Sequence, residues 1–450
     1  MDMFDDFTKR AKEYLAGNNK NPVYPSQASI DALQQLNIPL QEESLQPEQV
    51  LAALDEIGSP ATVRSSGGRY FGFVTGGSLP AALFAKLFAT VWDQNSGLSV
   101  QSPAAVTLED ISAQWLLSIL GLPESCGVGF VTGATMANFS ALVSARHFIL
   151  KNEGWDVEAK GLFHAPEITV ITGDEVHVSL LKALNLAGLG RERIIRIPAD
   201  DQGRMMIEKI PAIVGSAIIC AQAGNVNTGA FDNIDRICDR FPDKNIWVHV
   251  DAAFGLWAAA SPKLKHLVKG IEKADSWATD AHKWLNVPYD CGLVFVKNKD
   301  SLVKAMSASA SYLPTTNMRE PFQYAPEMSR EARGVSVWAA LKYLGRKGLA
   351  ELIERNCFYA RQFAYKLKEA GYSILNEVVL NQVLVSFGNA DTTLKIIKAV
   401  QEDGTCWCGG TVWQGKTAMR ISVSSWATSD EDVKSSIEAI ILIAKKNIPG

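Results

Sequence analysis

The strongest constraint on the fold is an alternation between short β-branched runs and longer helical stretches. Apolar runs at 127–132, 168–172, 217–221 and 246–250 are each separated by enough chain for a helix. Parallel strands need such crossover connections, whereas antiparallel strands can be joined by tight turns. The pattern therefore predicts an α/β fold, in which helices cover both faces of a large, mostly parallel sheet.

The flanking regions have a different character. Residues 1–60 read as polar and helical with several proline breaks, which favours an arm that packs against a partner. The α/β pattern spans 61–310, and 311–340 reads as a proline-punctuated loop followed by a connecting helix. Residues 341–450 mix amphipathic helices with strands, so we expect a smaller C-terminal α+β domain.

Composition narrows the class of protein and of partner. The chain has 450 residues, 47% of them hydrophobic, and a net charge of −4, so neither nucleic acid nor a membrane surface is expected as a partner. The acidic start lacks the pattern of a signal peptide. Seven scattered cysteines suit reduced thiols in a cytoplasmic protein, and the lone pair Cys406 and Cys408 does not predict a metal site.

Lys283 and Asp251 point to a particular cofactor. Lys283 lies between His282 and Trp284 in a stretch of low charge, where a lysine is expected to be neutral or chemically occupied. Asp251 directly follows the apolar run 246–250. Each residue taken alone has a simpler explanation: Lys283 as a surface lysine, and Asp251 as an aspartate that caps the next helix. Together they fit pyridoxal 5'-phosphate (PLP), held by the lysine as a Schiff base and by a carboxylate that keeps the ring nitrogen protonated.

Two further segments fit the same site. Thr132, Gly133, Ala134 and Thr135 join a predicted strand to a helix, and small and hydroxyl residues there suit a phosphate group. His177 follows another predicted strand, where its imidazole suits stacking on the PLP ring. Alone, the first segment is more typical of a turn and helix cap than of a phosphate site, and the histidine is more typical of a cap or core position. Their order along the chain with Asp251 and Lys283 strengthens the prediction.

These residues resemble the group II PLP-dependent amino-acid decarboxylases. This family includes aromatic-L-amino-acid, histidine, tyrosine and glutamate decarboxylases and has the PLP-dependent transferase type I fold of aspartate aminotransferase. The resemblance covers nearly the whole chain. The segments of this chain that carry the resemblance are 68–74, 92–97, 102–109, 132–138, 224–232, 251–253 and 282–284.

The resemblance implies roles for individual residues around the cofactor. It implies that His177 stacks on the ring, that Ala253 packs under it, and that His282 lies near the phosphate. Asn225 replaces a threonine near the phenolic oxygen of the cofactor. Asp280 stands where many members carry asparagine or serine near the phosphate, and we expect it to face away because a carboxylate repels phosphate.

The resemblance is weakest at the loop after the lysine. Residues 312–327 form a shorter loop than in the aromatic decarboxylases. Tyr324 is the nearest candidate for the catalytic loop tyrosine that protonates the quinonoid carbon, although it does not align residue for residue. Arg330 and Arg333 match the basic positions that follow the loop.

Three residues are candidates for contact with the substrate. Phe71 and Trp92 suit an apolar or aromatic side chain, or else pack in the core or a dimer interface. Arg420 suits a substrate carboxylate, as an arginine does in aminotransferases, or else a structural ion pair. An acidic substrate remains compatible with the sequence.

The main hypothesis is decarboxylation of an L-amino acid to its amine and CO₂ through an external aldimine and a quinonoid. The resemblance also implies a homodimer with shared active sites. One alternative is another PLP reaction on this fold, namely carbon–carbon cleavage by another lyase, aldehyde synthesis or transamination. A second alternative is a binding protein without catalysis, which the intact set of Lys283, Asp251 and His177 disfavours.

Overall fold

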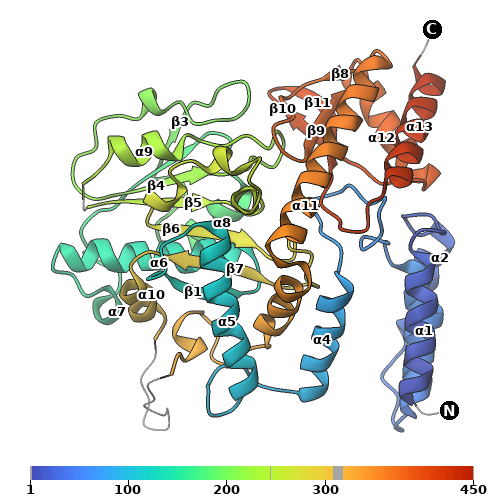
Figure 1. The fold of residues 1–450 in the computed structure, drawn as a ribbon, viewed down its shortest axis with the longest axis horizontal. Coiled ribbons are helices and arrows are strands. Elements are labelled where there is room, and N and C mark those ends of the chain that lie inside the picture. Colours follow the sequence, from blue (N-terminus) through green and yellow to red (C-terminus); the bar gives the residue numbers. More distant parts are fainter. Residues whose placement is uncertain (1–2, 244, 308–317, 449–450) are drawn as a thin grey trace. The chain divides into compact units, whose positions relative to one another are not determined.

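The computed structural model describes residues 3–243, 245–307 and 318–448. It divides into two compact units (Figure 1). The large unit comprises Ser78–Arg361 and Asn376–Val383, and the small unit comprises Met1–Gly77, Gln362–Leu375 and Leu384–Gly450. Among the described helices, none is long and apolar enough to cross a membrane.

The large unit is built on a seven-stranded sheet with the order β1-β7-β6-β5-β4-β2-β3. Its strands are β1 (Gly127–Val131), β2 (Thr169–Gly173), β3 (Ile194–Ile197), β4 (Ala217–Gln222), β5 (Ile246–Asp251), β6 (Ser276–Asp280) and β7 (Gly292–Val296). Only β7 is antiparallel to its neighbours, β1 and β6, so the other six strands run the same way. The predicted α/β class with a mostly parallel sheet is confirmed.

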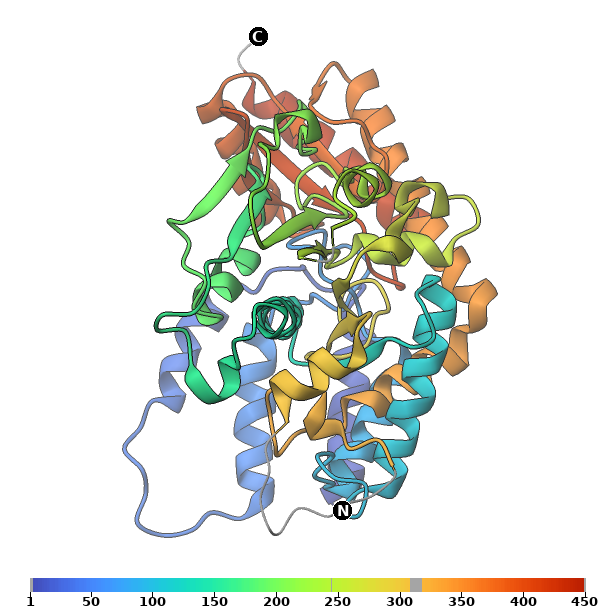
Figure 2. The same cartoon turned by 90° about the vertical axis from the view of Figure 1, so that its left-hand side faces the viewer.

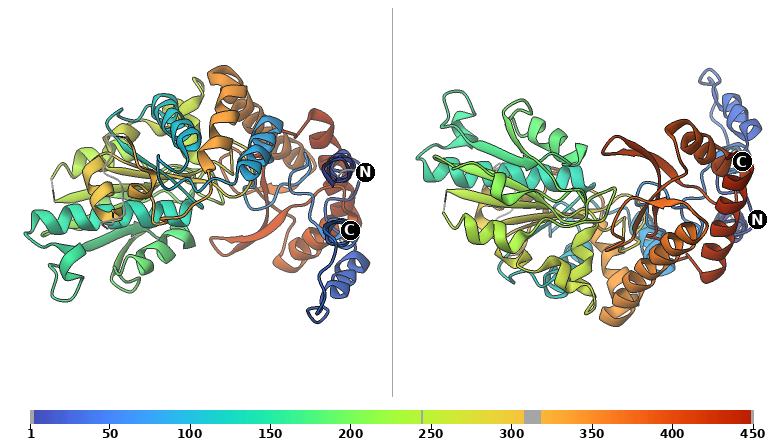
Figure 3. Two further views of the ribbon diagram at one scale, coloured as in Figure 1. Left: turned by 90° about the horizontal axis from the view of Figure 1, so that it is seen from below. Right: turned by 90° about the horizontal axis from the view of Figure 1, so that it is seen from above.

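Helices cover both faces of this sheet, with α5 on one side and α6 on the other (Figure 3). Figure 2 looks almost along the axis of α6. The helices are α4 (Pro80–Trp92), α5 (Pro103–Leu120), α6 (Ala134–Asn152), α7 (Val157–Lys160), α8 (Val178–Leu186), α9 (Ile234–Arg240), α10 (Lys299–Met306) and α11 (Arg333–Glu369). Short helical turns are η4 (Ile207–Lys209), η5 (Gly255–Ala260), η6 (Lys265–Val268), η7 (Ile271–Lys273) and η8 (Pro321–Gln323). Gly345 breaks α11, because its positive φ of 59° is outside the helical range.

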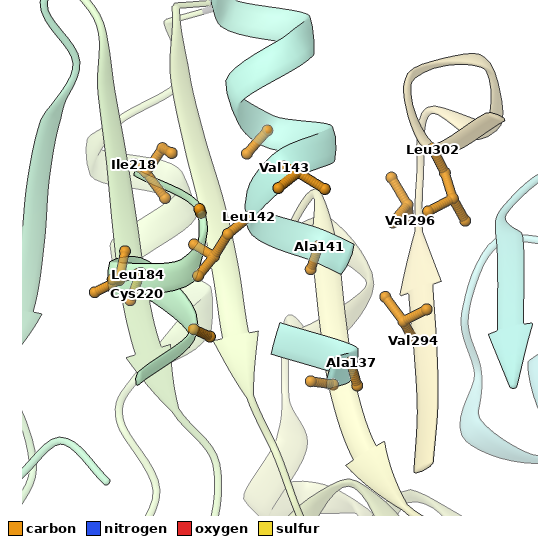
Figure 4. Close-up of a cluster of buried hydrophobic side chains, with 14 of the residues drawn as sticks. Ala137, Ala141, Leu142, Val143, Leu184, Ile218, Cys220, Val294, Val296 and Leu302 are labelled. Carbon is orange, nitrogen blue, oxygen red and sulfur yellow. The ribbon is translucent and has the colours of Figure 1, made fainter. Parts of the chain in front are cut away.

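The core of the large unit lies between α6, α8 and the sheet (Figure 4). Small residues of α6, such as Ala137 and Ala141, bring the helix close to the strands, and Leu142 fills the space beside Ile218 of β4. This packing buries eleven of the nineteen residues of α6. The start of α6 is thereby held rigidly against the ends of the strands.

The small unit contains a second sheet with the order β10-β11-β9-β8. Its strands are β8 (Ser373–Ile374), β9 (Gln382–Ser386), β10 (Gly409–Trp413) and β11 (Lys416–Ser422). Its helices and turns are α1 (Met3–Gly17), α2 (Gln27–Ala32), η1 (Leu33–Leu36), α3 (Pro47–Ala53), η2 (Leu54–Gly58), η3 (Ser59–Ala61), α12 (Ala390–Asp403) and α13 (Asp430–Asn447). Asn389 and Ser429 cap α12 and α13 through their side chains, which explains where both helices begin.

Candidate active site

Four segments meet at the carboxyl edge of the large sheet. β1 leads into the turn before α6, β2 leads to His177, β5 ends at Asp251, and β6 ends at Asp280 just before Lys283. Because these strands run in the same direction, their carboxyl ends lie at one edge, where open α/β sheets bind ligands. The structure thus brings together the residues that the sequence placed far apart.

Asp251 is a buried carboxylate with fixed hydrogen-bond donors. Its side chain accepts hydrogen bonds from Asn138 Nδ2 over 3.1 Å and from the backbone N–H of Ala253 over 3.3 Å. Burial raises the pKa of Asp251, while the charges of His177 and Lys283 and the Asn138 hydrogen bond act in the opposite direction. Such a carboxylate is suited to face a cationic partner, as a protonated pyridine nitrogen is.

Lys283 follows β6 and remains partly accessible, with 18% of its side chain exposed. Its Nζ lies 3.0 Å from Asp280 Oδ2. The neighbouring Trp284 is fully buried and donates from Nε1 to Asn356 Oδ1 over 2.9 Å. This anchor fixes the backbone beside Lys283, so the lysine amine projects from a rigid support.

Asp280 faces the start of α6, which corrects the expectation that it faces away. The backbone N–H of Ala134 donates to Asp280 Oδ1 over 2.6 Å. The free N–H groups at a helix start carry partial positive charge, and with Lys283 they attract the buried carboxylate. Asp280 therefore shares its surroundings with the predicted phosphate loop.

The loop before α6 is shaped for close backbone approach. Gly133 is extended, with φ 168°, and a Cβ on Gly292 would lie 2.5 Å from its backbone. Gly292 thus allows the loop to lie against β7. Thr132 and Thr135 are half-buried on either side of Gly133 and Ala134.

His282 is neutral and oriented. Its Nδ1 accepts the backbone N–H of Cys291 over 3.1 Å, so the ring proton lies on Nε2, 3.5 Å from Asp280 Oδ1. Burial lowers the pKa of His282. The ring also packs on Tyr289, with centroids 4.4 Å apart.

His177 is a helix cap, one of the alternatives that the sequence left open, and its stacking on the cofactor ring remains a prediction. It caps α8, because its Nδ1 accepts the backbone N–H of Ser179 over 3.2 Å. It also lies close enough to Asp251 for its charge to lower the pKa of that carboxyl group. A cap at this position holds the imidazole at the sheet edge.

Asn225 stabilises its own turn. Its Oδ1 accepts the N–H groups of Asn227 and Thr228, and its Nδ2 donates to Gln222 Oε1 over 3.1 Å. Ala253 is half-buried and linked to the site through its hydrogen bond to Asp251. Contact of either residue with the cofactor remains a prediction.

Tyr324 is buried and Trp92 is exposed, and their contact with substrate remains a prediction. Tyr324 is buried in the core of the large unit, with the Arg319 guanidinium 4.4 Å from its ring centroid. Residues 311–317 of the predicted loop lie outside the described residues. Trp92 ends α4 and is 42% exposed, next to Phe88 on an open apolar face.

Phe71 and Arg420 belong to the small unit. Phe71 is buried and packs edge-on against Phe363, with centroids 5.0 Å apart. Arg420 lies on β11, where burial lowers the pKa of its guanidinium. Their contact with substrate remains a prediction.

The sequence did not single out three buried residues that support the site. Glu109 pairs with Arg330 over 2.8 Å, and Arg330 Nη2 donates to the carbonyl of Phe130 just before the phosphate loop. Asn138 and His249 hydrogen-bond to each other over 2.9 Å behind Asp251. The alternation along β5 could have identified His249, because residues 249 and 251 lie on the same face of a strand.

Comparison with known proteins decides the family. The model described as pyridoxal-dependent decarboxylase conserved domain matches residues 31–388. The chain belongs to this family. It is 28% identical over 369 residues to an aromatic-L-amino-acid decarboxylase of Bacillus atrophaeus, covering 77% of this chain and 73% of that protein. It is 29% identical over 331 residues to the acidic amino acid decarboxylase GADL1 of Homo sapiens, covering 70% of this chain but only 63% of the relative.

Solved structures show the same fold. Oryza sativa TDC with PLP and tryptamine matches with a TM-score of 0.91 at 21% identity, covering 98% of this chain and 97% of the other. The 4-hydroxyphenylacetaldehyde synthase of Rhodiola rosea matches with a TM-score of 0.87 at 19% identity, covering 100% of both chains.

The donor set of the site fits PLP. It offers a lysine amine, a buried carboxylate for a ring nitrogen, and a helix start with small residues for a phosphate. The predicted cofactor and the predicted class, a PLP-dependent amino-acid decarboxylase, are confirmed by the family.

Proposed function

We propose that this decarboxylase converts an L-amino acid to its primary amine and CO₂ with Lys283 as the cofactor-bearing residue. One observation carries the proposal: the Lys283 amine, the buried Asp251 carboxylate and the start of α6 lie at one edge of one sheet. PLP, when bound, supplies an electron sink that takes up the electron pair left by CO₂.

The residues of the chain hold and orient this chemistry. Asp251 would hold the ring nitrogen in its protonated form, and Lys283 Nζ would hold the cofactor. His177, fixed as the cap of α8, would orient the substrate and so limit which of its bonds is aligned for cleavage. Ala253 and Asn225 would complete the pocket for the ring.

The start of α6 would hold the phosphate. Thr132, Gly133, Ala134 and Thr135 would supply hydroxyls and backbone N–H groups, of which the Ala134 N–H is shared with Asp280, and His282 would supply the N–H of Nε2. This part of the site anchors the cofactor but does not take part in bond cleavage.

Tyr324 was the sequence candidate for returning a proton to the product carbon. Its burial in the core beside Arg319 supports a packing role instead. We therefore assign proton return to Lys283 Nζ, with His177 beside it. The same observation supports a second candidate function, aldehyde formation, in which O₂ instead of a proton would react after CO₂ is lost: amino acid, O₂ and water would give aldehyde, CO₂, ammonia and hydrogen peroxide.

Arg420 is proposed to bind the substrate carboxylate. Burial lowers the pKa of its guanidinium, and none of the ion pairs between described residues includes it. A half-buried guanidinium without a carboxylate partner favours an anionic ligand. Phe71 and Trp92 are proposed to contact the substrate side chain.

We propose that the protein is a homodimer. α4 exposes a continuous apolar face at helical spacing, formed by Phe84, Phe88, Val91 and Trp92. Exposed apolar faces of this kind are typical of subunit interfaces. Residues 1–60 are proposed as the arm that packs on the partner, since α1 exposes Phe4 and Phe7. Light scattering of wild type and Phe88→Asp tests this, with a monomeric wild type contradicting it.

A cytoplasmic location is also proposed. All seven cysteines are free thiols, and six of them are buried. Free thiols persist in a reducing compartment. Fractionation of cells that produce the full-length protein tests this location.

The function is tested with PLP-loaded protein and a panel of amino acids that includes aromatic and acidic members. CO₂ and amine in equal amounts from one group of substrates support the proposal. Lys283→Ala is expected to abolish both products while the fold is retained. Aldehyde in place of amine would favour the second candidate function.

A further inference from the structure

We infer that Trp247, Ser276, His249 and Asn138 form a one-way hydrogen-bond relay that ends on Asp251 and keeps it an oriented carboxylate. These four residues would be positioning residues for the cofactor ring nitrogen, although none of them touches it. The inference rests on the proposed role of Asp251 and deepens it.

The relay is continuous through the core of the large unit. Trp247 Nε1 donates to Ser276 Oγ over 2.8 Å, and Ser276 Oγ lies 2.9 Å from His249 Nδ1. His249 Nε2 lies 2.9 Å from Asn138 Oδ1, and Asn138 Nδ2 donates to Asp251 Oδ2 over 3.1 Å.

Regular structure places these residues in line. Trp247, His249 and Asp251 alternate along β5, so their side chains share one face of the sheet. Ser276 starts β6 and is paired in register with His249. Asn138 comes from the second turn of α6, whose packing against the sheet brings its amide between His249 and Asp251.

The direction of the relay follows from its two ends. The Trp247 indole can only donate, so Ser276 Oγ accepts from it. The hydroxyl proton of Ser276 stays available for donation to His249 Nδ1. The remaining proton of a neutral His249 then lies on Nε2 and is donated to Asn138 Oδ1. Asn138 Nδ2 therefore faces Asp251, whose Oδ2 accepts from it, and a donor at this position favours the ionised carboxylate. If His249 and Asn138 were turned the other way, Asn138 Oδ1 would face Asp251, and Asp251 would have to be protonated in order to donate to it.

The electrostatics agree with this direction. Burial lowers the pKa of His249 to about 3 against the smaller, opposing effect of a backbone hydrogen bond with Ser276, so its ring is neutral at physiological pH and can accept at Nδ1. Burial also raises the pKa of Asp251, and the Asn138 hydrogen bond opposes that rise. His249, Asn138 and Ser276 are all fully buried, so water does not replace a lost link.

The test compares Asn138→Ala and Ser276→Ala with Ser144→Ala. Ser144 is an equally buried serine of α6, but its hydroxyl donates to the Ser140 carbonyl of its own helix, away from the relay. Each full-length protein is loaded with pyridoxamine 5'-phosphate that carries ¹⁵N in the ring. The ¹⁵N chemical shift of the ring nitrogen, followed against pH, reports its protonation independently of activity.

In wild type the ring nitrogen is expected to stay protonated to high pH. Asn138→Ala should move its titration midpoint down by about one to two pH units, the size expected for losing a hydrogen bond to a charged group. Ser276→Ala should shift it in the same direction by less, and Ser144→Ala should leave it unchanged. Ser276→Ala removes a single oxygen and decides the question if Asn138→Ala does not fold.

Asp251→Asn separates this inference from the proposed function. If Asp251→Asn lowers the midpoint strongly while Asn138→Ala and Ser276→Ala do not, the relay is wrong and the site stands. If Asp251→Asn itself leaves the midpoint unchanged, the proposed role of Asp251 fails. An equal shift in Ser144→Ala would show that general loosening of the core, not the relay, moves the titration.

Discussion

Asp280→Asn is predicted to strengthen binding of the cofactor phosphate. Asp280 accepts the backbone N–H of Ala134 over 2.6 Å, and that N–H belongs to the helix start proposed to bind phosphate. A carboxylate there occupies a donor and repels an anion. Asparagine has nearly the same shape but lacks the charge, and it can turn its Nδ2 donor towards the phosphate, which releases the Ala134 N–H.

The magnitude follows from the donor that is released. A hydrogen bond to a charged group contributes about 1.5–3 kcal/mol. Freeing the Ala134 N–H for phosphate should therefore lower the Kd roughly 10- to 150-fold, since each 1.4 kcal/mol is a factor of ten. The loss of the ion pair between Asp280 and Lys283 affects every ligand of the site, so it has to be measured separately.

The assay is fluorescence titration with pyridoxamine 5'-phosphate and with pyridoxamine. Neither ligand forms a Schiff base with Lys283, and only the first carries the phosphate. The gain in Asp280→Asn should appear with the phosphorylated ligand alone. Asp290→Asn is the control, because Asp290 is a nearby carboxylate that pairs with Arg333 rather than with α6. Equal gains for both ligands, or none for the phosphorylated one, would refute the competition between Asp280 and phosphate.

Three further predictions concern stability and substrate binding. Glu109→Gln should lower the free energy of unfolding by about 3–5 kcal/mol, because it leaves the fully buried Arg330 without its carboxylate. Urea unfolding measures this loss, and the control Glu167→Gln should show little change because its pair with Arg193 is exposed. Equal losses in the two variants would contradict the argument. Burial lowers the folded-state pKa of His249 to about 3, below the ordinary 6.5, so the unfolded chain binds a proton more readily than the folded protein. The free energy of unfolding is therefore highest above pH 6.5 and falls as pH drops towards 3, by up to about 1.4 kcal/mol per pH unit from this group. Urea unfolding of His249→Gln across this range should give a shallower slope, and an unchanged slope would show that His249 is not the group responsible. Arg420→Lys should raise KM about tenfold or more with a smaller effect on kcat if Arg420 binds the substrate carboxylate, and steady-state kinetics with unchanged KM would assign it a structural role instead.

The alternating pattern allowed the parallel sheet to be predicted from sequence. Apolar runs of strand length, each followed by enough residues for a helix, leave few other arrangements. The antiparallel β7 and the edge position of β1 are set by tertiary pairing, for which the local sequence carries no signal. The same holds for the Gly345 break in α11, since glycine also occurs inside regular helices.

Site residues could be predicted from sequence where a residue type is rarely buried without a chemical role. Lys283 in a low-charge segment and Asp251 after a strand both needed a chemical explanation. Asp280 was predicted to face away because only its repulsion of phosphate was considered, whereas its attraction to the α6 N-terminus and to Lys283 determines its orientation. Tyr324 was selected by its nearness to a loop, but hydrophobic burial decides its position.

The most direct test of the central claim is the fate of an amino acid labelled with ¹³C in its carboxyl group. PLP-loaded wild type and Lys283→Ala are incubated with the best substrate of the panel, and labelled CO₂ and amine are quantified together. The account predicts equal amounts of both from wild type and neither from a folded Lys283→Ala. Undiminished CO₂ release by Lys283→Ala would contradict it.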